Sequence, residues 1–142
     1  MGQQMRIWAV ALALAPVACG STLPAPPLTQ HPLSAFVEVP YPPPAALAET
    51  VPPKPDRDDV VWLDGEWQYR GRGFVWRRGG WVVAPPASRF APWRSWYRRD
   101  GRLMFASGTW YDERHERVRR PEAIAAAATP PNEVTTELQT GR

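Results

Sequence analysis

The chain has 142 residues, a formal net charge of +3, eight tryptophans and eighteen prolines. That length fits one domain, but the crowding of prolines before position 60 excludes a single compact domain over the whole chain. One cysteine excludes an intramolecular disulfide. The part able to form a core is about residues 58–120, a small domain for which dense aromatic packing offsets the limited burial.

The N-terminal segment has the pattern of a secretory signal peptide. Arg6 supplies one positive charge, residues 7–15 are almost continuously apolar, and small residues lead to Cys19. The apolar run is too short for a transmembrane helix. Pro16-Val17-Ala18-Cys19 resembles the lipobox of bacterial lipoproteins, with Pro16 where that family usually has Leu. The resemblance implies a lipoprotein signal peptide over residues 1–18, lipid attachment at Cys19 and, because Gly20 is not Asp, the outer membrane.

Proline dominates residues 19–57, which follow the cysteine. Proline cannot donate a backbone hydrogen bond and favours extended polyproline II. We therefore predict a disordered tether that could hold a domain on the order of 100 Å from its lipid, at about 3.1 Å per residue. Proline-rich ligands of aromatic-lined grooves have similar sequences, but a solvated spacer after a lipid anchor is the simpler interpretation.

An aromatic-x-x-Gly-x-Trp motif occurs three times and organises the remaining sequence. Its positions are Trp62, Gly65 and Trp67, then Trp76, Gly79 and Trp81, then Phe105, Gly108 and Trp110. We expect these residues to be structural, with most of the tryptophans in the core and each glycine at a turn position of positive φ. Closely spaced turns leave no room for helices. The pattern predicts an all-β domain over residues 58–120, a small antiparallel meander of hairpins with about five to seven short strands.

Three further stretches lie on either side of the third motif copy. Asp100-Gly101 is a hairpin signal, and residues 115–118, within the charged and polar stretch 112–120, are expected to form an edge strand. Residues 121–142 begin with an alanine-rich run of high helix propensity that is too short to be stable alone. We predict a disordered tail beyond it.

The motif copies, together with Tyr69, Phe74 and the Pro85-Pro86 pair after the second copy, resemble the YXWGXW (WXXGXW) repeat proteins. That resemblance spans residues 62–110, and the third copy departs from the pattern because Phe105 replaces Trp. It implies a small exported bacterial protein, often a lipoprotein, built of short hairpins. It supplies no catalytic residues.

The residue types argue against an enzyme. Of the two histidines, His31 lies in the predicted tether, and His115 with nearby acids gives too few ligands for zinc. The carboxylates that could pair as in a glycosidase are Asp64, Glu66, Asp100 and Asp112. Asp64 and Asp100 already have a sufficient role as turn residues before glycine. We predict no catalytic residues, no metal and no cofactor.

An aromatic cluster edged by arginines is the predicted contact surface. Its members are Trp93, Trp96 and Tyr97 with Arg94, Arg98 and Arg99. Adjacent residues on a strand point to opposite faces, so a thin sheet cannot bury all three rings. Arginine stacks on aromatic rings and binds carboxylate or phosphate in a forked geometry.

Two functions fit these features. The first is a binding or scaffolding module, attached to the membrane by its N-terminal lipid, that contacts an envelope glycan, an anionic lipid or another envelope protein. The second is a passive structural spacer without a ligand. Basic charge with interleaved aromatic rings also suits nucleic acid, but an exported protein rarely meets it, so no nucleic-acid partner is expected.

Overall fold

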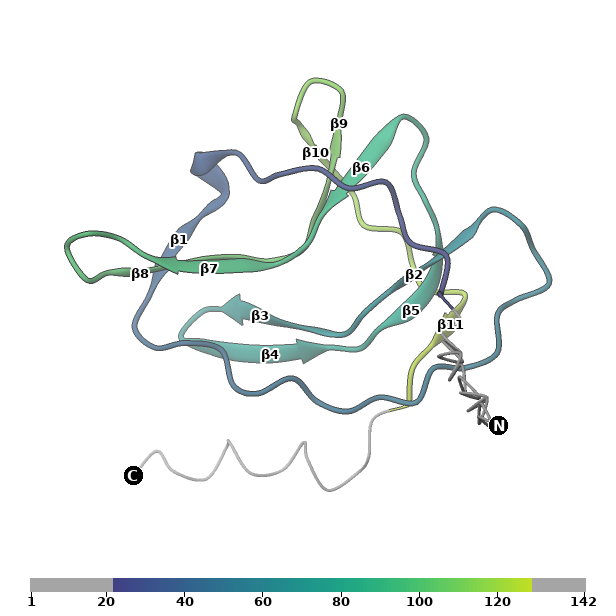
Figure 1. Cartoon of the computed structure of the whole chain (residues 1–142), viewed down its shortest axis with the longest axis horizontal. Helices are drawn as coiled ribbons and strands as arrows, with labels where there is room; N and C mark the ends of the chain where they lie inside the picture. Colours follow the sequence, from purple (N-terminus) through teal and green to yellow (C-terminus); the bar gives the residue numbers. More distant parts are fainter. Residues whose placement is uncertain (1–21, 129–142) are drawn as a thin grey trace, which may run out of the picture.

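A computed structural model describes residues 22–128 and shows an antiparallel all-β fold (Figure 1). The predicted fold class is confirmed. One 3₁₀ turn, η1 (Leu33–Ala35), and eleven strands lie in this part of the chain. The strands are β1 (Val37–Val39), β2 (Val60–Leu63), β3 (Glu66–Arg70), β4 (Gly73–Arg77), β5 (Gly80–Val83), β6 (Ser88–Ala91), β7 (Arg94–Tyr97), β8 (Leu103–Ala106), β9 (Thr109–Asp112), β10 (Arg117–Val118) and β11 (Ala125–Ala126).

Strands β2 to β5 form one long hairpin, called hairpin 1. The chain reverses at Gly71, where φ is 63°, and β3 pairs with β4 on either side of that turn. Farther from the turn, β2 pairs with β5 in the same register, with Leu63 opposite Gly80. Asp64-Gly65 is therefore an interruption inside the hairpin, and the hairpin turn predicted there is wrong.

Strands β6 to β9 repeat this arrangement as hairpin 2. β7 pairs with β8 beside the turn at Gly101, where φ is 82°, as the Asp100-Gly101 signal predicted. β6 pairs with β9 in the same register beyond an interruption at Pro92 and Gly108. Because each long strand is divided by an interruption, residues 60–118 contain more strands than predicted.

The motif tryptophans face one another across the hairpins. In hairpin 1, Trp62 opposes Trp81 with ring centroids 5.4 Å apart, and Trp67 opposes Trp76 at 5.1 Å, both edge to face. Such geometry is favourable for aromatic pairs. Trp81 is 1% exposed, whereas Trp67 and Trp76 are only half-buried. Trp81 and Trp110 are thus buried as predicted, together with Trp62, whereas the prediction of core positions is wrong for Trp67 and Trp76.

The two hairpins share their core. One buried cluster joins Phe74 of hairpin 1 to Leu103 and Phe105 of hairpin 2, and another joins Leu63 and Val82 to Phe90 and Trp110. Figure 1 shows the β7–β8 arm lying above the β3–β4 arm. The short strands β1, β10 and β11 then pair with β8, β9 and β5 respectively.

The proline-rich residues from 22 to 57 pack on the hairpins, which corrects the prediction of a tether. β1 pairs with β8, and the backbone N–H groups of Trp62 and Phe90 donate to the carbonyls of Pro24 and Pro27. Farther along, the indoles of Trp67 and Trp81 donate to the carbonyls of Ala45 and Pro52. The prediction considered only the N–H that proline lacks, whereas its carbonyl still accepts hydrogen bonds.

Two further predictions are changed at the C-terminal side. The edge strand is β10, and His115 lies before it in a turn with φ of 61°. The alanine-rich run, expected to be too short for a stable helix of its own, contains β11, because pairing with β5 offers its backbone partners.

The predicted signal peptide, Cys19 and the tail from residue 129 lie outside the described residues. Within residues 22–128 no helix is long and apolar enough to cross a membrane.

Candidate functional site

Strand β7 is exposed along its whole length, as predicted for the aromatic cluster. Trp93 is 43% exposed, Trp96 43% and Tyr97 64%. β7 is the outer strand of the three-stranded sheet β1-β8-β7, so one of its edges has no neighbouring strand. Three large aromatic side chains within five positions of an outer strand are unusual for a surface without a partner.

The pairing register divides this cluster between two faces. Tyr97 opposes the buried Leu103, and the Trp93 ring lies nearly parallel to Phe105, so both belong to the side that carries the core. We call this the inner face of β7. Trp96 opposes Met104 and contacts Phe36 edge to face at 6.1 Å, on the outer face. The predicted single platform is therefore two surfaces.

The arginines follow the same division. Arg94 shares the outer face with Trp96, whereas Arg98 and Arg99 lie at the exposed tip beside Tyr97. Arg98 lies 3.6 Å from Asp100 in an exposed ion pair, which contributes little to stability. The tip therefore presents guanidinium groups next to an exposed ring.

A buried carboxylate, Glu66, holds the two hairpins together, a role that nothing in the local sequence pattern indicates. It is 4% exposed, and its Oε2 accepts a hydrogen bond from the Gly108 N–H at 3.1 Å. Its Oε1 lies 3.4 Å from Arg120 Nη1 and 3.6 Å from Arg77 Nη1. Burial raises the pKa of Glu66, and the charges of Arg120 and Arg77 and the Gly108 N–H oppose that rise. Burial also lowers the pKa of Arg120 to about 10, with the charge of Arg77 adding to this effect.

A second glutamate, Glu49, occupies the equivalent place in hairpin 1. Its Oε2 accepts from the Gly79 N–H at 2.9 Å and its Oε1 from the Trp76 indole at 2.8 Å. A Cβ on Gly79 would lie 2.8 Å from the Leu63 carbonyl oxygen and 2.9 Å from this carboxylate. A Cβ on Gly108 would likewise meet the Glu66 carboxylate.

These contacts correct the predicted role of the motif glycines. Among the described glycines, positive φ occurs at Gly71 and Gly101 and not at Gly65, Gly79 or Gly108. The motif glycine is required because a carboxylate approaches the backbone where a Cβ would stand.

His31 and the other candidate carboxylates have structural partners. The ring of His31 lies 3.1 Å from the Tyr111 hydroxyl and 2.8 Å from the Pro92 carbonyl, and its pKa is lowered chiefly by burial. Asp64 accepts from the Trp62 indole, and Asp112 accepts from two backbone N–H groups of the turn that contains His115. Within residues 22–128 no three His, Cys, Asp or Glu side chains gather as a metal site.

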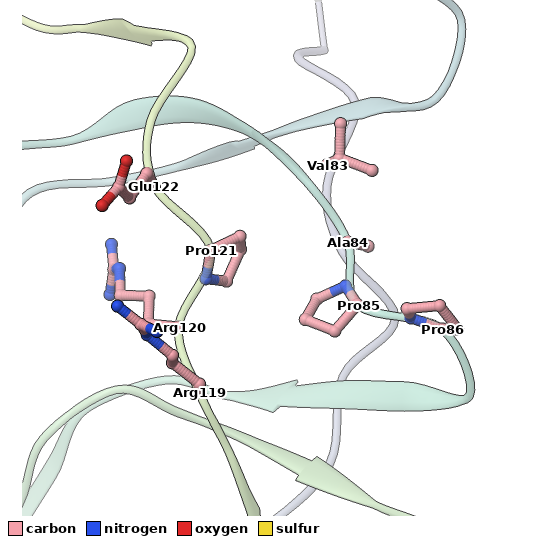
Figure 2. A pocket seen from close by; sticks show the side chains of 8 residues that line it. All are labelled: Val83, Ala84, Pro85, Pro86, Arg119, Arg120, Pro121 and Glu122. Atoms are coloured by element: carbon pink, nitrogen blue, oxygen red, sulfur yellow. The ribbon is translucent and has the colours of Figure 1, made fainter.

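An open groove of about 460 Å³ lies between two proline-containing segments, residues 83–86 and 119–122. Figure 2 shows Arg119, Arg120 and Glu122 on one side and Pro85 and Pro86 on the other. Arg120 is already engaged by Glu66 and lies 6.0 Å from the Phe90 ring centroid. The groove brings together no nucleophile and base.

Comparisons were made with family models, with curated proteins and with solved structures, and none of them matches this chain.

Proposed function

We propose that this protein is an exported, lipid-anchored binding module of the bacterial cell envelope. Cys19 carries the lipid, and the inner face of β7 with the adjoining tip contacts an anionic envelope glycan. The protein acts by binding, without a cofactor, and belongs with the YXWGXW repeat proteins.

The observation that carries this proposal is the exposure of Tyr97 beside Arg98 and Arg99. Tyr97 is 64% exposed although it stands opposite Leu103 of the core cluster. An exposed ring offers an apolar surface with a polar group, and adjacent guanidinium groups bind carboxylate or phosphate in a forked geometry. Together they suit a polymer that carries sugar rings and anionic groups.

Retention of the full chain on immobilised envelope polysaccharide tests the binding step. All proteins carry Cys19→Ser so that acylation plays no part. Tyr97→Ala combined with Arg98→Gln should weaken retention at least about tenfold, equivalent to about 1.4 kcal/mol. Val75→Ala is the matched control, since Val75 is an exposed side chain on β4, 53% accessible. Equal retention of parent and double variant would leave the passive spacer as the better description.

Anchoring is tested separately in cells. The mature parent should begin at Cys19, carry acyl groups and partition into detergent, and Cys19→Ser should not. An intact Met1 on the membrane-bound parent, seen by mass spectrometry, would refute lipidation at Cys19.

A further inference from the structure

The N-terminal segment, residues 22–40, limits how far the hairpins can lie from Cys19. Pro24 accepts a hydrogen bond from the Trp62 N–H at 2.7 Å, and Pro27 accepts from the Phe90 N–H at 2.8 Å. Thr29 then donates to the Phe90 carbonyl at 2.9 Å. Only residues 20–23 separate Cys19 from the first of these contacts. At 3.3–3.6 Å per residue, that stretch reaches at most about 18 Å.

Exposed leucines line this same segment. Leu23 is 41% exposed, Leu28 58% and Leu33 83%. In Figure 1 the segment runs from beside β2 past β6 to η1 and β1. Single exposed leucines need no explanation, but three along the segment nearest the proposed anchor point to one apolar surface.

Phe36, which follows the leucines along the segment, contacts the outer face of β7. The Phe36 ring contacts the rings of His31 and Trp96, with centroids 5.7 Å and 6.1 Å apart. Trp96 thus lies beside the segment that carries the leucines. Tryptophan is enriched where one side of a ring meets apolar matter and the other meets water, as at the level of lipid headgroups.

Cations border this surface. Arg94 and Arg117 are exposed, and both lie close enough to His31 to act on it electrostatically. The nearby acid on the outer face, Glu38, lies 3.3 Å from Arg102 and is compensated by it. Apolar side chains flanked by arginine suit a membrane surface that carries anionic headgroups.

We infer that the face formed by Leu23, Leu28, Leu33 and Trp96, with Arg94 and Arg117 at its border, lies on an anionic lipid surface. The inference deepens the proposed anchoring at Cys19, because a short connection brings this face to the membrane that holds the lipid. The inner face of β7, on the other side of the same sheet, is then left for the glycan. The protein is held against the bilayer and does not stand at the end of a long spacer.

Vesicle binding tests this inference independently of acylation and of the glycan. Full-chain proteins with Cys19→Ser are co-sedimented with vesicles of phosphatidylethanolamine and phosphatidylglycerol, or of phosphatidylcholine alone. Leu28→Ser with Leu33→Ser should lower the partition coefficient on the anionic vesicles at least tenfold. The control, Val51→Ser with Val75→Ser, removes apolar side chains that are 40% and 53% exposed elsewhere, and should change it less than twofold. Residues 1–18 are the same in every protein, so the difference reports the face alone.

A second measurement, fluorescence quenching, tests whether Trp96 lies at the lipid surface. Brominated lipids should quench part of the tryptophan fluorescence of the bound parent, and that part should be lost in Trp96→Phe but retained in Trp93→Phe. Equal partition of the leucine variant and the parent, or quenching that does not depend on Trp96, would overturn the inference. A leucine variant whose sedimentation coefficient changes without vesicles, at unchanged partition, would identify an interface between copies and would also overturn it. Whether Tyr97→Ala loses glycan retention has no bearing on the vesicle partition or on the tryptophan quenching.

Discussion

At the motif glycines, a carboxylate from a distant residue occupies the space in which any other residue would place its Cβ. Gly108 lies against Glu66 and Gly79 against Glu49, and in each case the glycine N–H donates to the carboxylate. The glycine does two things at once, because it leaves room for the acid and supplies a donor to it. A buried charge is tolerated only when it has such partners.

Gly108→Ala should therefore destabilise the protein by about 1–3 kcal/mol, the usual cost of inserting atoms into a packed site. Its Cβ would lie 2.7 Å from Phe90 Cζ, besides meeting the carboxylate. Gly73→Ala is the control, since the nearest atom to its Cβ is the Tyr41 hydroxyl at 3.6 Å, an ordinary contact. Urea unfolding monitored by fluorescence measures both. Similar midpoints for the two variants would show that the close approach at Gly108 is unimportant.

The Glu66 carboxyl should make stability depend on pH. Burial raises its pKa above the ordinary value of 4.5, so the folded state keeps the proton to higher pH than the unfolded chain does. Its contribution to stability is then fully present below 4.5 and decreases as pH rises through the raised pKa. The free energy of unfolding of the parent, minus that of Glu66→Gln, should fall with rising pH above 4.5 and then become constant. A difference that rises over this range would mean that Arg77 and Arg120 outweigh the burial.

At the scale of elements, the sequence predicted strands well and their partners poorly. Alternation and turn residues identified the all-β class and the reversal at Asp100-Gly101, because these depend on neighbouring residues. Whether the chain reverses or continues at Asp64-Gly65 depends on a distant residue, Glu49, that fills the space beside Gly65 and Gly79. The exposure of Trp96 and Tyr97 followed from strand geometry, but their division between two faces required the register with β8.

The largest error at this scale concerns residues 41–55, called the proline-rich strap, which were predicted to be part of a disordered tether. Five prolines in residues 42–44 and 52–53 favour an extended chain, but they do not decide whether that chain lies in water or on the protein. Tryptophan favours contact with the protein, because the indole N–H groups of half-buried and buried rings need acceptors and the carbonyls of the strap supply them. A high tryptophan content beside a proline-rich segment was thus evidence for contact.

Glu49→Ala should test whether the strap belongs to the fold. It removes an acceptor from the buried Gly79 N–H and from the Trp76 indole, and unsatisfied buried donors cost about 1–3 kcal/mol. Glu38→Ala is the matched control, since its pair with Arg102 is exposed and worth at most about 1 kcal/mol. Thermal unfolding of the two variants gives the comparison. If the Glu49→Ala protein were as stable as Glu38→Ala, residues 41–55 would be better described as a solvated linker.

At the scale of the whole molecule, the two hairpins share two of the three buried clusters of the described chain, and the third joins hairpin 1 to the segment around β11. Hairpin 1 supplies Phe74 and hairpin 2 supplies Leu103 and Phe105 to one cluster, which the N-terminal segment completes with Val39. Glu66 of hairpin 1 accepts from Gly108 of hairpin 2. The N-terminal segment also bonds to both hairpins, at Trp62 and at Phe90. Separate unfolding of either hairpin would expose these shared groups.

We therefore expect one cooperative unfolding transition, although the sequence repeats the same hairpin design twice. Far-ultraviolet circular dichroism reports the strands of both hairpins, while near-ultraviolet circular dichroism reports the packing of aromatic rings such as the Trp62–Trp81 and Phe90–Trp110 pairs. The two signals should give superimposable urea curves, and Gly108→Ala in hairpin 2 should shift both to the same extent. If hairpin 1 retained its signal after hairpin 2 had unfolded, the curves would separate and the variant would shift only one of them. That result would make each hairpin an independent unit, and the Glu66–Gly108 contact a weak link between two domains.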